Sequence, residues 1–181
     1  MYNDLDFRYK NLESSKDFVA DIHCVHSKET PVHLTFSIAL NLVDIAPDLK
    51  SKTQVCSLDA KGNVSCLPSS WQGDTLFAKS RSFGHFSAII DTVAPSIKTK
   101  SFTYDLSQAK NMSFIVNDDL SGVSTYNAFV DGQWVLLEYD PKNKLLSHFF
   151  DGKITKGKHL IELVVFDSVK NEKRLVLEFL R

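Results

Sequence analysis

Short strand-like segments follow one another along this chain, and no long helical segment interrupts them. Each runs for about 5–8 residues, is rich in Val, Ile, Phe, Tyr and Thr, and ends at turn-forming residues. The expected strands cover residues 5–9, 19–25, 33–40, 53–58, 63–67, 75–80 and 86–91, then 96–98, 112–116, 124–130, 133–139, 145–150, 159–167 and 174–180. The only helix candidates are short, at 44–50 and 106–110. A parallel α/β fold needs long crossover helices, so the pattern predicts an all-β fold of the sandwich type.

A break at residues 91–95 divides the chain into two parts. The sequence there is DTVAP, and Pro95 removes a backbone donor and fixes φ, which ends a strand. We therefore expect two tandem β-sandwich modules, at residues 1–93 and 94–181. Each has about 90 residues, which is enough to bury a core of its own.

Charge and hydropathy narrow the classes of function. The chain has 21 basic and 22 acidic residues, a formal net charge of −1, which argues against broad binding to nucleic acid or to anionic lipid. The longest apolar runs, at residues 37–42 and 160–166, are too short to span a bilayer. The first 15 residues contain no apolar signal-peptide core. Two explanations remain open: a cytoplasmic protein, or part of a longer exported protein in which Met1 is not the native start.

Two hairpins are predicted in detail. Asp131 and Gly132 lie between apolar runs, and both tolerate the positive φ of a type I′ turn. In residues 58–64 a type I turn with Gly62 in the left-handed region closes a second hairpin. Counting outward from that turn places Cys56 directly opposite Cys66.

The opposed pair Cys56 and Cys66 is a disulfide candidate. A directly opposed, non-hydrogen-bonded pair has a short Cα separation that suits a bridge. The loop is short, so a bridge would add roughly 2–3 kcal/mol of stability. The alternative is two reduced thiols packed side by side, as expected in a cytosolic protein.

Two groups of residues are weak candidates for a metal site, and we expect neither a bound metal nor another cofactor. His23 and His26 flank Cys24, and His33 could approach from the next strand to complete a zinc site. The alternative is a strand with one buried cysteine and two half-exposed histidines.

The second group, at strand ends, consists of Asp118, Asp119 and Asp167, with Asn117 beside them. Calcium takes six to eight oxygen ligands. The alternative, which we favour, is that these side chains cap tight turns through their own backbone hydrogen bonds.

Aromatic residues are abundant, with 13 Phe and 2 Trp. Most should be core residues, and Trp71 and Trp134 are the largest anchors. We expect Trp134 in the core or lower interface of the second module. Aromatic side chains gathered on one sheet face would instead form a platform for glycans.

The order of several motifs resembles one region of a known family. The motifs are WQGD at 71–74, AKSRSFGHF at 78–86, DTVAPSI at 91–97, DDLSGV at 118–123, VDGQWV at 130–135, EYD at 138–140 and KGKH at 156–159, with PVH at 31–33. Together they resemble the β-sandwich region that follows the catalytic domain in lysostaphin-type zinc metallopeptidases of Bacteroidetes envelopes, in the peptidoglycan-hydrolase group. The resemblance implies that the second module is immunoglobulin-like.

The resemblance does not extend to the catalytic motifs of that family. Its zinc ligands come from an H-x-x-x-D motif and an H-x-H motif, and neither occurs here. The resemblance therefore implies a non-catalytic accessory region in the periplasm or cell envelope, with any signal upstream, which positions, targets or stabilises a peptidase domain of the same polypeptide on peptidoglycan. The alternatives are an independent adhesin-like or glycan-binding protein and, less favoured, a hydrolase or metal enzyme without a recognisable motif.

Overall fold

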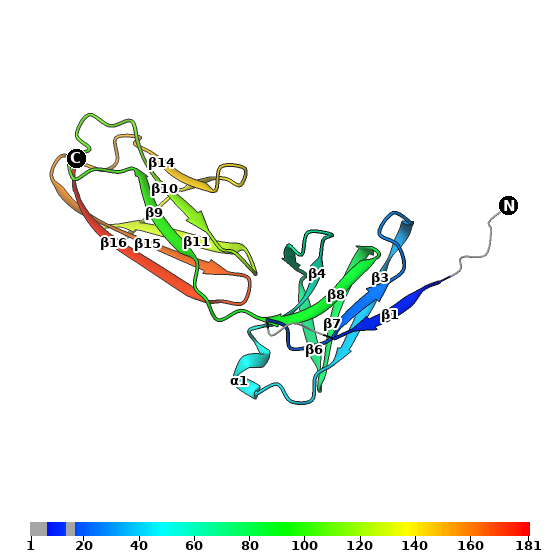
Figure 1. Cartoon of the computed structure of the whole chain (residues 1–181). Coiled ribbons are helices and arrows are strands. Elements are labelled where there is room, and N and C mark those ends of the chain that lie inside the picture. Colours follow the sequence, from blue (N-terminus) through cyan, green and yellow to red (C-terminus); the bar gives the residue numbers. More distant parts are fainter. Residues whose placement is uncertain (1–6, 14–16) are drawn as a thin grey trace. The chain divides into compact units, whose positions relative to one another are not determined.

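The chain is almost entirely β-structure. A computed structural model describes residues 7–13 and 17–181, so part of the strand expected at 5–9 lies outside the described residues. The chain divides into two compact units, Met1–Thr92 and Val93–Arg181 (Figure 1). No helix within the described ranges has the length and apolar character that a membrane crossing needs.

The first unit is a sandwich of two antiparallel sheets. The five-stranded sheet has the order β1 (Tyr9–Leu12), β2 (Ile22–Val25), β8 (Gly84–Ile90), β4 (Thr53–Leu58) and β5 (Val64–Cys66). The three-stranded sheet has the order β3 (Pro31–Asn41), β7 (Thr75–Ser82) and β6 (Ser69–Gln72). Alternate residues of β3, Ile38 and Leu40, are buried against Val55 and Phe86 of the opposite sheet. This period of two is what a strand with one buried face requires.

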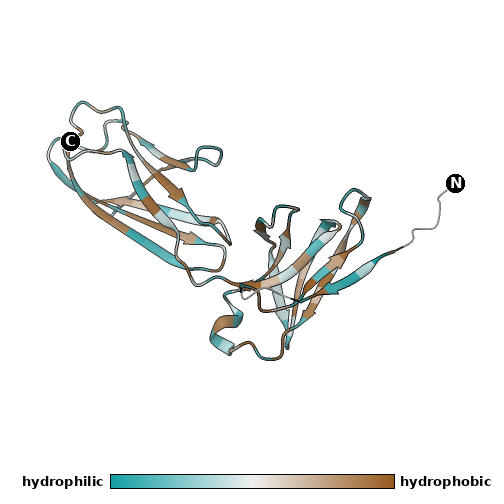
Figure 2. Cartoon of the chain, viewed as in Figure 1, coloured by the Kyte–Doolittle hydropathy of each residue, from teal (hydrophilic) through white to brown (hydrophobic). Residues whose placement is uncertain are grey.

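The second unit has the immunoglobulin topology. One sheet has the order β13 (Glu138–Asp140), β14 (Leu145–Phe149), β10 (Asn111–Asn117) and β9 (Ser96–Ser101). The other has the order β12 (Gln133–Val135), β11 (Val123–Val130), β15 (Lys158–Asp167) and β16 (Glu172–Leu180). In chain order these are the ABED sheet and the CFG sheet with an added C′ strand. Hydrophobic and hydrophilic bands alternate along the strands (Figure 2), and Phe114, Leu163 and Phe179 meet in the core.

Both predicted hairpins are confirmed. Asp131 and Gly132 have φ values of 49° and 79°, and Val130 lies opposite Gln133. Gly62 has a φ of 81°, and its backbone N–H donates to the Asp59 carbonyl. The resulting register places Cys56 opposite Cys66. In both cases local turn chemistry fixes the pairing of the strands.

Some expected elements differ from the structure. Residues 106–110 form a turn and not the expected helix. The backbone N–H of Ala109 donates to the Leu106 carbonyl and closes this turn. The helix expected at 44–50 shortens to α1 (Pro47–Lys50). The strand expected at 133–139 is two strands, β12 and β13, in different sheets, because Leu137 enters the core where the chain changes sheet. The strand β6, which follows Pro68, was not expected.

The position expected for Trp134 is wrong. Its side chain is 58% exposed, and Tyr126 and Ala128 of β11 pack in or against the core instead. Trp134 lies opposite Phe129 across the β11–β12 hairpin, whereas the core residues Ala128 and Val130 alternate with Phe129 along β11. Trp134 therefore takes the register of the outward-facing positions.

A histidine–aspartate pair ties the β11–β12 turn to the start of β15. Asp131 Oδ2 lies 2.6 Å from His159 Nδ1, and Asp131 Oδ1 accepts from the backbone N–H of Leu160. His159 Nε2 lies 2.9 Å from the Thr155 carbonyl oxygen. Both ring nitrogens thus face acceptors. The hydrogen bond with Asp131 raises the pKa of His159, burial opposes this rise, and the same bond lowers the pKa of Asp131.

This pair predicts a pH-dependent contribution to stability. A raised histidine pKa contributes stability that is complete below the ordinary value of 6.5 and is lost as pH rises through the raised value. A lowered Asp131 pKa contributes stability above the ordinary 3.8 and loses it as pH falls. We expect Asp131→Asn to lower the unfolding free energy of the second unit by about 0.5–1 kcal/mol near pH 5.5, since Asp131 is half exposed, and by less near pH 9.

Denaturant unfolding at the two pH values measures this difference. Asp140→Asn is the matched control, because Asp140 also accepts hydrogen bonds in a turn, from Asn143, and has no hydrogen bond with a histidine among the described residues. An equal loss for Asp131→Asn at both pH values would contradict the predicted role of the charged pair.

Candidate functional site

A groove of about 440 Å³ in the second unit gathers exposed apolar side chains. It is lined by residues of β12, of the crossing to β13, of β14 and of the loop after it. Trp134 and Leu136 are each 58% exposed, and Phe149 is 53% exposed. Single exposed apolar residues are common on protein surfaces, but three around one concavity indicate a binding surface.

His148 adds a polar group to the groove. Its side chain lines the groove and is only 7% exposed. Nδ1 lies 2.9 Å from the Leu136 carbonyl oxygen, which fixes the ring, and Phe150 packs edge-on against it. Nε2 is buried and has no hydrogen-bond partner among the residues that the structure describes. A buried nitrogen without a partner has a free-energy cost, so the contribution of His148 to the groove is the fixed face of its ring.

Charged groups lie at the rim of the groove. Glu138 lines it, and so do Asp151 and Lys153, which form an ion pair of 2.6 Å. Asp151 Oδ1 also accepts from the backbone N–H of Lys153, and the hydrogen bonds with this residue hold the pKa of Asp151 below its ordinary value. The groove therefore combines flat apolar faces with a few fixed donors and acceptors, which suits a ligand with both apolar faces and hydroxyl groups.

The histidines proposed for zinc make other contacts. His23 Nδ1 lies 2.6 Å from the Tyr9 hydroxyl oxygen, and His26 packs against the rings of Phe7 and Phe83. His33 is exposed on β3, and Cys24 is half-buried on β2. In the described part of the chain these four residues do not bring three ligand atoms within 4.8 Å of one another. His23 and His26 are half-buried, as the alternative expects, whereas Cys24 is half-buried and not buried.

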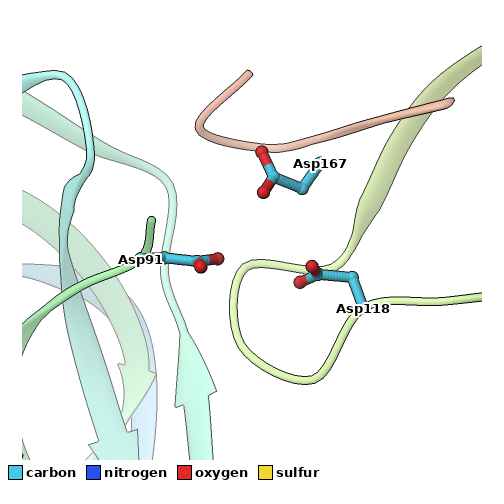
Figure 3. Close-up of side chains that lie close together, drawn as sticks. All are labelled: Asp91, Asp118 and Asp167. Atoms are coloured by element: carbon cyan, nitrogen blue, oxygen red, sulfur yellow. The ribbon is translucent and has the colours of Figure 1, made fainter. Parts of the chain in front are cut away.

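Two of the three calcium candidates lie close together in the second unit (Figure 3). Asp118 and Asp167 have carboxylate oxygens within 4.8 Å of each other, whereas Asp119 is exposed and accepts from Asn117 Nδ2. Figure 3 also labels Asp91, which belongs to the first unit, where its backbone N–H donates to the Lys52 carbonyl. The calcium site stays a prediction.

Both neighbouring carboxylates cap their own loops. Asp118 Oδ1 accepts from the backbone N–H groups of Leu120 and Gly122. Asp167 Oδ1 accepts from those of Val169 and Asn171, and its Oδ2 accepts from Asn171 Nδ2. These are the Asx hydrogen bonds expected of aspartates at tight turns.

Capping by Asp167 predicts a stability effect that needs no metal. Asp167 is fully buried, so Asp167→Ala leaves its loop donors without an acceptor and should cost about 2–4 kcal/mol in EDTA. Asp119→Ala is the control, with an expected change within about 0.5 kcal/mol. Denaturant unfolding with EDTA and with calcium measures both. If Asp167→Ala lowered the unfolding free energy only in the presence of calcium, Asp167 would instead be a calcium ligand.

Comparison with known proteins identifies the first unit. Residues 1–91, half of the chain, match the Zu5-like domain. The chain belongs to the Zu5-like domain family. Among solved structures, the apo form of the expansin of Clavibacter michiganensis is similar, with a TM-score of 0.35 and 12% identity over 94% of this chain and 87% of that one. At that score no residue of the expansin can be equated with one here. No curated protein matches the sequence.

The Zu5-like unit contains the opposed cysteines. Cys56 is fully buried, and Cys66 is half-buried. Burial raises the pKa of Cys56 to about 12, and the neighbouring Cys66 adds to the rise. Because the thiolate is the reactive form, the buried Cys56 is a poor nucleophile in the folded Zu5-like unit. The disulfide between the two stays a prediction.

Alkylation followed by mass spectrometry tests the state of this pair. In the folded, reduced protein near pH 8, we expect Cys56 to react at least about 100-fold more slowly than after unfolding, with half-buried Cys24 as internal reference. In protein unfolded without reductant, modification of Cys24 alone would show the bridge. Modification of all three cysteines would rule it out.

Proposed function

We propose that the chain is a non-catalytic accessory region of a cell-envelope zinc peptidase and that it targets this enzyme to the glycan of peptidoglycan. The groove around Trp134 and Phe149 carries the binding part of the proposal. The ordered motifs that resemble a region of lysostaphin-type peptidases support the association with a peptidase and the location in the envelope.

The groove chemistry favours a sugar over a charged polymer. The apolar C–H face of a pyranose ring packs on a flat aromatic ring, and Trp134 and Phe149 expose more than half of their surface there. The sugar hydroxyls can bond with Glu138, Asp151 and Lys153 at the rim of the groove. Two acids and one lysine leave little net charge, so the groove lacks the cationic lining that a polyanion would need.

An accessory groove of this kind acts through effective concentration. A module that binds the polymer weakly keeps a tethered catalytic domain near its substrate without adding any chemistry. Because each contact of such a module is weak, it should dissociate quickly. Fast dissociation allows the enzyme to move along the polymer.

Sedimentation with purified peptidoglycan tests the proposal. We expect the wild-type chain to be retained well above a control protein and Trp134→Ala to bind at least about tenfold more weakly, since a central exposed tryptophan is a typical hot spot. Phe149→Ala should weaken binding in the same direction. Tyr104→Ala is the matched control, because Tyr104 is an equally exposed aromatic residue of the same unit outside the groove.

Two outcomes would contradict the proposal in different ways. No retention of the wild-type chain would remove targeting to peptidoglycan. Full retention of both Trp134→Ala and Phe149→Ala would show that the binding site lies outside the groove.

An independent glycan-binding or adhesin-like protein is the second candidate. The groove favours it because its lining comes from this chain alone. Immunoblotting of envelope fractions distinguishes the two. A native polypeptide much larger than 20.4 kDa agrees with a peptidase parent, whereas a mass equal to this value supports the independent protein.

A further inference from the structure

A second concavity, in the Zu5-like unit, has a different chemistry from the groove proposed to bind glycan. It encloses about 340 Å³ between the β4–β5 hairpin and the end of β7. Four basic residues line it: Lys28, Lys79, Arg81 and His85. Such concave basic sites focus the electrostatic potential and attract anions.

The carboxylate of Asp59, which interacts electrostatically with Lys28, offsets only part of the positive charge of this site. Asp59 is the one carboxylate in the lining. Its Oδ1 accepts from the backbone N–H groups of Lys61 and Asn63, and its Oδ2 accepts from Asn63 Nδ2, so its own turn uses both oxygens. Within residues 7–13 and 17–181, Lys79, Arg81 and His85 form no ion pair and no side-chain hydrogen bond. The site therefore keeps a local excess of positive charge in a chain whose formal net charge is −1.

Neutral donors surround the same space. Four serines line it: Ser57, Ser65, Ser80 and Ser82. The hydroxyl groups of Ser57 and Ser80 donate to the Ser65 and Ser82 carbonyls, which leaves those of Ser65 and Ser82 to donate to a ligand. The pairing of β6 with β7 ends at Ser69 opposite Ala78, so the β6 side of β7 has no strand neighbour beyond Ala78 in the described structure. Alternate backbone N–H groups point outward from such an edge. Hydroxyl groups, backbone amides and cations from separate elements can thus converge on one ligand.

We propose that this concavity binds the phosphoryl group of a small phosphorylated ligand. A phosphate carries several oxygens that each accept hydrogen bonds, and it pairs well with Arg and Lys together. The volume lies at the lower end of the range for small-molecule sites. The site lies in the other unit from the glycan groove and takes another class of ligand, so it is independent of the proposed function.

Titration of the isotope-labelled full chain, followed by backbone amide NMR shifts, tests the proposal. The probes are inorganic phosphate and glycerol 3-phosphate, each against sodium chloride at the same ionic strength. We expect saturable shifts in residues 57–59 and 79–86 with at least one phosphate probe and none with chloride. If glycerol 3-phosphate bound more tightly than inorganic phosphate, the ligand would be a phosphomonoester. Equal affinities for the two probes would indicate that the ligand is free phosphate. Equal shifts with chloride, or no saturation, would overturn the proposal.

The double variant Lys79→Ala/Arg81→Ala locates the site. Both side chains are exposed on β7, so we expect the fold to persist, with an unchanged amide spectrum elsewhere, and phosphate to bind at least about tenfold more weakly. Lys10→Ala is the control, because Lys10 is an exposed cation on β1, at the other edge of its sheet from β5. Equal affinities of the double variant and the control would overturn the assignment. Peptidoglycan sedimentation of the double variant should be unchanged, which separates this test from that of the glycan groove.

Discussion

The crossing of the chain between the two sheets of the second unit creates the groove around Trp134 and Phe149. The strands β12 and β13 belong to different sheets, and the chain passes between them at Leu136 and Leu137. Leu137 is 5% exposed and enters the core, whereas Leu136 is 58% exposed. Burial of one leucine forces its neighbour outward. The carbonyl oxygen of Leu136 then accepts a hydrogen bond from Nδ1 of His148. The apolar rim and the fixed histidine therefore share one cause.

Local chemistry explains which parts of the fold were predictable from sequence. The turn at Asp131 and Gly132 and the turn closed by Gly62 depend on residues that tolerate positive φ, so their register follows from a few neighbouring positions. The opposition of Cys56 and Cys66 follows from the same register. The capping by Asp118 and Asp167 was likewise expected, because an Asx turn requires only the aspartate and the residues directly after it.

Features that depend on distant contacts were not predictable in this way. The apolar run from Trp134 to Leu137 does not alternate, so its pattern cannot show where the chain changes sheet. Trp134 was therefore expected in the core, where a large aromatic residue usually lies. A continuous apolar run directly after a two-residue turn was the available signal, since such a run cannot all be buried by one sheet. Phe149 and His148 join the groove through pairing of β14 with other strands, which no local pattern encodes.

The two concavities differ because their sandwiches leave different edges open. In the second unit the edge beside β12 is bordered by apolar side chains and by an internally paired Asp151 and Lys153, so little charge remains for a ligand. In the Zu5-like unit the short β6 leaves the end of β7 uncovered, and the side chains there are cations and serines. Open sheet edges favour unwanted strand pairing, and charged residues at an edge oppose it. Lys79 and Arg81 therefore have a structural role that is compatible with anion binding: they keep the uncovered edge of β7 from pairing with another chain, and they leave donors at its end for a small ligand.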